Sequence, residues 1–380
     1  MRRRTAYVLI LCLASLLTVG IVMLFSTGAF ARDSHGDMYY FVKRQAMWLC
    51  IGGAAMIVAA MVDYRLWAKW WPAVYALAVV LLVLCFVPPI GMKVNGAWRW
   101  IDLGFASFQP SELGKVAVLL FLARWYERYE AEAAEFWRGF AAPLAVAGVI
   151  MGLIVIEVDL GTTALIGTTA LAVMFVAGTG LRWILPLLAA GMAGLGVAIF
   201  HMEERLARFM AFLDPEKYKL GEGLQQWQAL LAFGAGGVEG VGLGSGRQKM
   251  LYLPYAHTDF IFPMIGEELG LRFTLLTVFC FLLILLCGVL IAMNAKDRFG
   301  MLLGFGITII ITLQAAINIG VTTSLLPNKG MPLPFISYGG SNLAVSMVLL
   351  GILLNIHRQG RREPRVRARA LPTTSLAVRF

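Results

Sequence analysis

The sequence predicts an all-α integral membrane protein with about ten spanning helices and a large extracytoplasmic loop between the seventh and the eighth. Composition is the first reason, because 59% of the 380 residues are hydrophobic and only 14% are charged. The mean hydropathy of +0.77 is too apolar for a water-soluble surface of mixed charges. The second reason is that apolar runs near 20 residues, the length that crosses a hydrocarbon core about 30 Å thick, recur along the chain.

Each predicted span is an apolar run bounded by charged or turn residues. The ten runs cover residues 6–27, 46–62, 71–90, 111–125, 140–156, 162–178, 183–200, 273–293, 301–320 and 343–356. The fourth and the tenth runs are short, and the centres of the runs carry almost no charge.

The orientation follows from lysine and arginine, which accumulate on the cytoplasmic side of membrane proteins. Arginines occupy positions 2–4, before the first run, and seven more follow the tenth run, between residues 358 and 379. An even number of spans then places both termini in the cytoplasm. We predict one polytopic membrane domain over residues 1–360 and a basic cytoplasmic tail over 361–380. Attraction to anionic inner-leaflet lipid accounts for the net charge of +10, so no nucleic-acid partner is expected.

Polar residues gather in segments that this orientation places outside the membrane. In the first, Arg99 stands between two tryptophans, and a proline after Gln109 begins a helix. Glu112 and Lys115 follow on one face of that helix, because they are three residues apart. One interpretation is an interfacial ion pair that seals the helix end. The other is a functional pair, the default for charges this close to hydrocarbon.

A short turn at residues 157–163 supplies two more acids. Asp159 has the position of an N-cap for the following span, a structural role that its side chain suits. A catalytic or binding role remains compatible with that capping role.

The segment from about residue 201 to residue 268 is far longer than an ordinary connection and calls for a functional reason. Residues 201–212 form an amphipathic stretch that Asp214 and Pro215 end. Residues 234–246 are rich in glycine but match neither a phosphate loop nor a dinucleotide fingerprint, so flexible packing is the expected role.

Asp259 is the acid of greatest interest in this loop, because an apolar run follows it directly. Desolvation at such an edge raises the pKa of a carboxyl group toward values that suit a general base. The alternative is that Asp259 caps a helix entering the membrane, while Glu267 and Glu268 form a solvated face. The spacing alone leaves both interpretations open.

Several blocks resemble the signatures of the SEDS family (shape, elongation, division and sporulation), the bacterial peptidoglycan polymerases. The blocks are Asn-Gly-Ala-Trp-Arg-Trp-Ile at 95–101, Phe-Gln-Pro-Ser-Glu at 108–112, His-Thr-Asp-Phe-Ile-Phe at 257–262, Gly-Glu-Glu-Leu-Gly at 266–270 and Pro-Leu-Pro-Phe-Ile-Ser-Tyr-Gly-Gly-Ser at 332–341. The division-type, FtsW-like members are the closer match, because Pro-Asn-Lys-Gly stands at 327–330 and Gln-Lys at 248–249. RodA-like, elongation-type members come second. Tyr255, in place of an acid, and Glu157-Val158-Asp159, in place of Gln-Pro-Asp, depart from the family pattern.

The resemblance implies an inverting glycosyltransferase that polymerises lipid II into glycan strands at the outer face of the bacterial cytoplasmic membrane, in cell division. The donor is a growing chain on undecaprenyl diphosphate. The catalytic acid of the family maps onto Asp259, which we expect to act as the general base. Expected substrate-binding residues are Arg99, Gln109, Ser111, Glu112, Lys115, Asp159, Arg247, Gln248, His257, Lys329 and Ser337. A divalent cation, Mg²⁺ or Mn²⁺, is the expected cofactor, with Glu112 or Asp259 as its ligand, and no organic cofactor is expected.

Partners also follow from the resemblance, namely lipid II and a class B penicillin-binding protein, a transpeptidase, with other division or elongation proteins. Two other functions compete with this one. A lipid II flippase or transporter would place ionisable residues at mid-bilayer in broken helices, whereas the acids here gather toward one side. A non-catalytic scaffold for division proteins would leave Asp259 dispensable.

Overall fold

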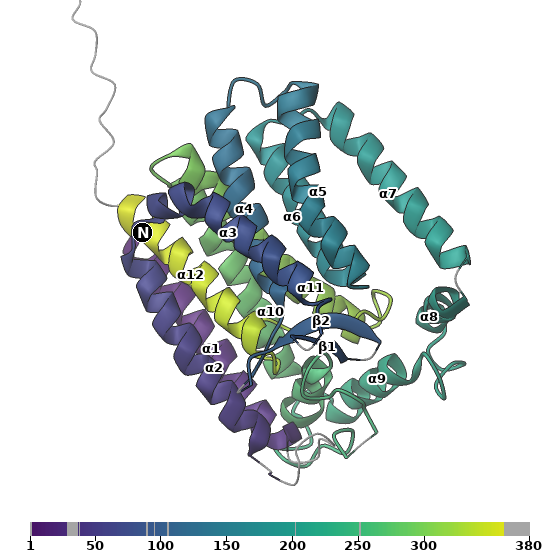
Figure 1. The fold of residues 1–380 in the computed structure, drawn as a ribbon. Helices are drawn as coiled ribbons and strands as arrows, with labels where there is room; N and C mark the ends of the chain where they lie inside the picture. The colour runs from purple at the N-terminus through teal and green to yellow at the C-terminus, as the bar shows by residue number, and fades with distance from the viewer. Residues whose placement is uncertain are drawn as a thin grey trace, which may run out of the picture.

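The computed structural model describes residues 2–28, 37, 39–88, 90–94, 96–104, 106–201, 203–250 and 252–360. They form a bundle of long helices with a small sheet at one end and a group of helices along one side (Figure 1). Figure 1 also places the start of the first helix and the end of the last at the same end of the bundle, as an even number of spans requires. The predicted basic tail, 361–380, lies outside the described residues.

Ten long helices overlap the ten predicted spans. They are α1 (Arg2–Gly28), α2 (Tyr40–Met61), α3 (Tyr64–Leu84), α4 (Pro110–Arg128), α5 (Ala142–Ile156), α6 (Leu160–Ala177), α7 (Leu181–His201), α10 (Ile261–Met293), α11 (Arg298–Thr322) and α12 (Gly340–Gly360). Eight of the described helices, α5 with the π-turn Trp137–Ala141 before it among them, are long and apolar enough to cross a membrane. The other two predicted spans coincide with α4, which carries charges, and with α7, in which Leu181–Gly194 is an apolar stretch.

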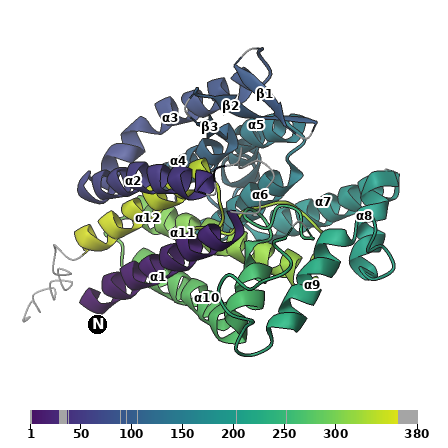
Figure 2. The same ribbon diagram turned by 90° about the horizontal axis from the view of Figure 1, so that it is seen from below.

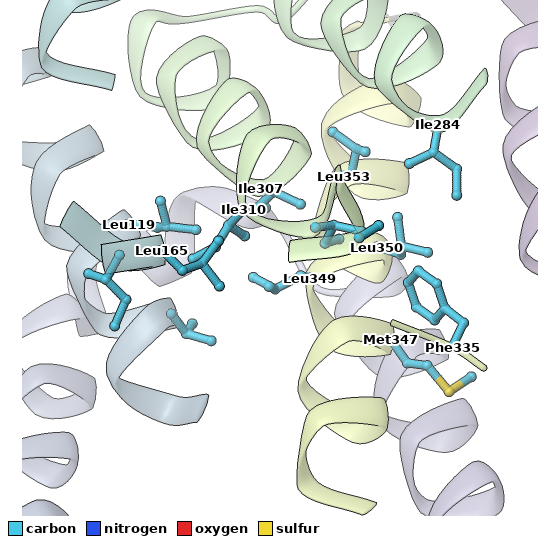
Figure 3. Packing of buried hydrophobic residues seen from close by; sticks show 14 of the residues in the cluster. Leu119, Leu165, Ile284, Ile307, Ile310, Phe335, Met347, Leu349, Leu350 and Leu353 are labelled. Carbon is cyan, nitrogen blue, oxygen red and sulfur yellow. The ribbon is translucent and has the colours of Figure 1, made fainter. Parts of the chain in front are cut away.

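The helices in the middle of the bundle are those whose side chains are buried on most sides. In the most apolar window of α12, 78% of the residues are buried, against 11% in α3. Figure 3 shows Leu119 of α4 and Leu165 of α6 beside Ile307 and Ile310 of α11, with Leu350 of α12 close by. Helix α4 lies in this core, so the side chains of Glu112 and Lys115 in its first turns face protein and not lipid.

Helix α10 is bent where it approaches the apolar run predicted at 273–293. Gly270 has φ 75° and ψ −173°, which breaks the helical geometry. A Cβ atom there would lie 2.4 Å from the backbone nitrogen of Gly240, so both the bend and the close packing require glycine. The bend at Gly270 separates a first helical part, which overlaps the end of the segment predicted at about 201–268, from a second part that covers the run predicted at 273–293.

A three-stranded antiparallel sheet connects α3 to α4, and the sequence analysis did not predict it. Its strands are β1 (Gly91–Val94), β2 (Ala97–Asp102) and β3 (Ser107–Phe108), in the order β1-β2-β3. The register pairs Val94 with Ala97 and Ile101 with Phe108. Figure 2 shows the sheet beyond the ends of α3 and α4, where β2 is able to carry a side chain across the end of the bundle.

The segment that follows α7 contains two shorter helices, α8 (Glu203–Leu213) and α9 (Leu224–Gly236). Together with α7 they lie along one side of the molecule (Figures 1 and 2). The predicted amphipathic stretch is α8, and it ends where Asp214 was expected to end it. Part of the glycine-rich stretch packs closely, since a Cβ atom at Gly236 would lie 1.9 Å from the carbonyl oxygen of Gly266.

Candidate active site

A cavity of about 460 Å³ lies at the end of the bundle that carries the sheet. Its walls come from α2, β1, β2, α4, α6, α11, the segment before α10 and the segment between α11 and α12. Seven of the twelve predicted site residues line it, namely Arg99, Gln109, Glu112, Lys115, Asp159, His257 and Asp259. Segments more than 150 residues apart in the sequence therefore converge on one polar cavity.

Asp259 lies in the cavity wall directly before α10. Its carbonyl oxygen accepts a 2.7 Å hydrogen bond from Nδ2 of Asn318, which also donates to the carbonyl oxygen of Met331 at 2.6 Å. The N-cap of α10 is Phe260, with no side-chain capping bond. The alternative prediction of Asp259 as a helix cap is therefore wrong, and its carboxyl group faces the cavity.

The electrostatic surroundings of Asp259 suit a group that exchanges a proton near neutral pH. Burial and the nearby Asp159 carboxylate raise its pKa to about 6, while the positive charge of Arg99 lowers it. A carboxyl group with this pKa is ionised at pH 7 and still basic enough to accept a proton.

Arg99 reaches the cavity from β2 and is held by the turn between α5 and α6. Its Nε and Nη2 atoms donate to the carbonyl oxygens of Glu157, at 3.3 Å, and Val158, at 2.6 Å. Val158 has φ 64°, a conformation that L-residues rarely adopt. The side chain of Glu157 is buried, and burial raises its pKa to about 8. With this pKa the Glu157 side chain is mostly protonated and uncharged at pH 7. It therefore does not neutralise Arg99, and the positive charge of the guanidinium acts on the cavity.

Asp159 has both of the roles that the sequence suggested. Its carboxylate caps α6, accepting from the backbone nitrogen of Thr162 at 3.2 Å and from Oγ1 of the same residue at 2.7 Å. It also lines the cavity, where Nε2 of Gln109 lies 3.3 Å from Oδ2. The capping prediction is confirmed, and the cap places a second negative charge close to Asp259.

The predicted pair of Glu112 and Lys115 is present, with 2.7 Å between Oε2 and Nζ, and both side chains are about 95% buried. Nζ of Lys115 also donates to Gln314 at 3.0 Å, and Asn342 donates to Oε1 of Glu112 at 3.1 Å. The pair therefore joins α4 to α11 and α12 at the floor of the cavity. It is a buried ion pair, more enclosed than the interfacial one that the sequence suggested.

Five predicted site residues do not line the cavity: Ser111, Arg247, Gln248, Lys329 and Ser337. Ser111 is buried, and its hydroxyl lacks a hydrogen-bond partner within the described part of the chain. Ser337 has a positioning role, because its hydroxyl donates to the carbonyl oxygen of Thr258 at 2.6 Å and accepts from the backbone of Leu333.

Arg247 and Lys329, the two basic residues among these five, make contacts outside the cavity lining. The backbone nitrogens of Arg247 and Gln248 donate to the carboxylate of Glu267, at 2.7 Å for Arg247. The side chain of Lys329 covers Gly161, whose Cβ position lies 2.8 Å from Cε of the lysine.

The prediction that Glu267 and Glu268 form a solvated face is wrong, since each is 1% exposed. Glu268 accepts hydrogen bonds from Nζ of Lys249 at 2.6 Å, from the hydroxyl of Ser26 at 2.7 Å and from the backbone of Gly244 at 2.9 Å. These contacts attach the long loop to α1 and α10.

The sequence analysis missed Arg44 and the aromatic wall beside it, formed by Tyr40, Phe41 and Tyr338. Helix α2 begins at residue 40, six residues before the apolar run used to predict it. An arginine at the predicted outer end of a span is unusual under the positive-inside rule. That unusual position is the signal that would have identified Arg44.

Comparisons with known proteins agree with this arrangement. The family model described as cell cycle protein, which groups FtsW, RodA and SpoVE, matches residues 6–362. A probable peptidoglycan glycosyltransferase FtsW of Geobacter metallireducens is 39% identical over 358 residues, 94% of this chain and 96% of the relative. Stage V sporulation protein E of Bacillus subtilis is 38% identical over 347 residues, 91% of this chain and 95% of the relative.

Solved structures show the same fold. A chain of a peptidoglycan synthase complex, whose structure addresses the coordination of polymerization and crosslinking, superposes with a TM-score of 0.78 and 26% identity, over 93% of this chain and 98% of that one. The rod shape determining protein RodA of Thermus thermophilus gives a TM-score of 0.68 and 25% identity, over 93% and 97%. The resemblance found in the sequence is confirmed, and the chain belongs to the FtsW, RodA and SpoVE family of cell cycle proteins.

Proposed function

We propose that this protein is a peptidoglycan glycosyltransferase that polymerises lipid II at the outer face of the cytoplasmic membrane, in cell division. The observation that carries the proposal is the carboxyl group of Asp259, which faces a polar cavity at one end of a membrane bundle with the Arg99 guanidinium close enough to act on its pKa. A substrate with a polar head and a polyprenyl tail reaches such a cavity without leaving the bilayer.

The reaction is a single displacement. The 4-hydroxyl group of the acceptor sugar attacks the anomeric carbon of the donor, and Asp259 takes its proton as the new glycosidic bond forms. The bond from that carbon to the lipid diphosphate breaks, with inversion from α to β. A positioned base contributes about 10²–10⁴ in rate to such a transfer.

Negative charge collects on the departing diphosphate and requires a cation opposite it. Arg99 suits this role, because backbone carbonyl groups hold it and no carboxylate lies within ion-pair distance of it among the described residues. Lys115 is a weaker candidate, since Glu112 already neutralises it.

A divalent cation fits this cavity only together with the substrate. Mg²⁺ is commonly held by one or two carboxylates and substrate phosphates, with water completing its shell. Asp259, with Asp159 near enough to affect its pKa, supplies such carboxylates, whereas Glu112 is engaged by Lys115 and Asn342. When bound, the ion would neutralise charge on the diphosphate.

A class B penicillin-binding protein is the proposed partner. The support is the likeness to a chain of a peptidoglycan synthase complex that covers both polymerization and crosslinking. A polymerase of this kind supplies the strands that a transpeptidase crosslinks.

The test is a polymerisation assay with purified protein, lipid II and Mg²⁺ or Mn²⁺, with and without a cognate transpeptidase. Glycan strands longer than the disaccharide are the expected product. Movement of lipid II across vesicles without any polymer would replace the proposal with a flippase. Absence of both activities in the presence of the partner would favour a scaffold.

The pH dependence of the reaction tests the base. We expect kcat/KM to rise with pH through an apparent pKa near 6, because only ionised Asp259 accepts a proton. Arg99→Ala removes the charge that lowers this pKa, so the acid limb moves to higher pH. Asp159→Asn moves it to lower pH and keeps a side chain able to cap α6. Initial rates between pH 4.5 and 8 give the apparent pKa of the unmodified protein and of both variants. The same apparent pKa in all three proteins would contradict the assignment of Asp259 as the base.

Gly330 lies against the carboxyl group of Asp259, and a Cβ atom there would be 2.5 Å from Oδ2. We expect Gly330→Ala to fold normally, because the atom it meets ends a movable side chain. The carboxyl group must nevertheless shift, and a displacement near 1 Å costs on the order of 10²-fold in rate. Rates and thermal melting in detergent check this. Gly148→Ala on α5, where a Cβ atom meets nothing within 4 Å, is the control and should leave the rate unchanged.

A further inference from the structure

Arg44 lies in the first turns of α2 and lines the cavity. Its guanidinium stacks over the ring of Tyr40, with 4.7 Å between its central carbon and the ring centroid. Its positive charge also acts on the hydroxyl of Tyr338, whose pKa it lowers against the effect of burial. Two aromatic side chains therefore fix the direction of this cation.

Arg44 differs from the other cavity cations in how its charge is balanced. Lys115 pairs with a carboxylate at 2.7 Å, and Arg99 is bound by backbone carbonyl groups near Asp259. Within the described residues, Arg44 has no carboxylate within ion-pair distance. An oriented guanidinium without an anionic partner in a cavity wall suits a phosphate or a carboxylate, which it can bind through two parallel hydrogen bonds.

The wall that carries Arg44 is connected to Asp259 but is distinct from the wall of Arg99. Phe41 contacts His257 with 4.3 Å between ring centroids and Tyr338 with 4.9 Å. The backbone of Tyr338 donates to the carbonyl oxygen of His257 at 3.0 Å. Arg44 therefore stands on α2 behind these aromatic contacts, whereas Arg99 stands on β2 and is held by the turn between α5 and α6.

The two substrates of the proposed reaction place their anionic groups differently. The donor carries its diphosphate on the carbon under attack, which is where Arg99 acts. The acceptor attacks through its 4-hydroxyl group, so its own diphosphate lies one disaccharide away, and its stem peptide carries further carboxylates. A second, more remote anion site is therefore required for the acceptor.

We propose that Arg44 binds an anionic group of the acceptor, either its diphosphate or a stem-peptide carboxylate, and that Tyr40 and Tyr338 orient it. This inference rests on the proposed function and places the acceptor at the cavity wall that carries Arg44. It assigns Arg44 to acceptor binding and leaves the proton transfer to Asp259.

Arg44→Ala should raise KM for lipid II, with kcat changed much less. The loss of one charge-assisted contact corresponds to roughly 10- to 100-fold. Arg44→Lys should recover part of the loss, because a point charge remains without the two-pronged geometry. Initial rates over a range of lipid II concentrations measure the split, and thermal melting confirms that each variant folds.

Lys43→Ala is the matched control. Lys43 is the neighbouring cation on α2, but its side chain is 68% exposed and pairs with Asp37 outside the cavity. Its kinetics should equal those of the unmodified protein. The inference would be overturned if Arg44→Ala and the unmodified protein had equal KM values, or if Arg44→Ala and Lys43→Ala raised KM equally. Polymerisation by the unmodified protein would still support the proposed function in either case.

A lipid II analogue without its stem peptide distinguishes the two anions. If the diphosphate is bound, Arg44→Ala keeps its full KM penalty on this analogue. If a carboxylate is bound, the penalty disappears and the unmodified protein shows the raised KM instead. A KM that responds to neither change excludes both anions and the inference with them.

Discussion

Asp259→Asn is expected to abolish polymerisation of lipid II and to leave the fold intact. The substitution keeps the size of the side chain but removes the ionisable group, so the acceptor hydroxyl loses its base and about 10²–10⁴ in rate. Stability should change little, because Asn318 donates its hydrogen bond to the backbone carbonyl oxygen of Asp259 and not to the carboxyl group. Phe260 caps α10 without a side-chain bond. Strand length on gels and the initial rate measure the effect.

Asp102→Asn provides the control for this experiment. Asp102 is an exposed acid in β2, outside the cavity, and its carboxylate accepts from the backbone of Gly104 at 2.7 Å. It should polymerise at the unmodified rate. If Asp259→Asn keeps more than one tenth of that rate, Asp259 is not the general base, even though the unmodified protein polymerises lipid II.

The features that the sequence predicted are those set by residues close together in the chain. Apolar length decides where a helix crosses a membrane, and all ten runs overlap helices. The pair of Glu112 and Lys115 and the cap made by Asp159 span three residues each, so helix geometry alone determines them.

The features that it did not predict depend on contacts between distant segments. Glu268 is buried because Ser26, 242 residues away, and Lys249 enclose it. A window of hydropathy contains neither contact, so two adjacent acids appeared solvated. Arg44 was missed because its charge excluded the first turns of α2 from the apolar run. The sheet was missed because its strands are two to six residues long.

The candidate site shows the same division. Motif resemblance selected the blocks that meet in the cavity, but it did not separate side chains that face the cavity from those that pack behind it. Gln248 and Ser337 belong to motif blocks, yet neither lines the cavity. The backbone nitrogen of Gln248 donates to the carboxylate of Glu267, and the hydroxyl of Ser337 donates to the carbonyl oxygen of Thr258. Which neighbours in a motif touch the substrate depends on the direction of each side chain, and that direction is set by tertiary packing.

Removing one partner from the buried ion pair of Lys249 and Glu268 should destabilise the fold strongly, although the intact pair itself contributes little. The two side chains are 1% and 0% exposed and lie 2.6 Å apart. Removing one partner of such a pair leaves a charge in a low-dielectric interior. That loss typically costs about 3–5 kcal/mol, more than either charge contributes while the pair is intact.

We therefore expect Lys249→Met to lower the free energy of unfolding by about 3–5 kcal/mol, and the double variant Lys249→Met, Glu268→Gln to recover most of the loss. Glutamine still accepts from Ser26 and from the backbone of Gly244 but carries no charge. Denaturant unfolding in detergent micelles gives the three values. Arg272→Ala, which breaks a pair with both side chains more than two thirds exposed, should be neutral. If the double variant is less stable than Lys249→Met, the penalty comes from lost packing, and uncompensated charge is not its cause.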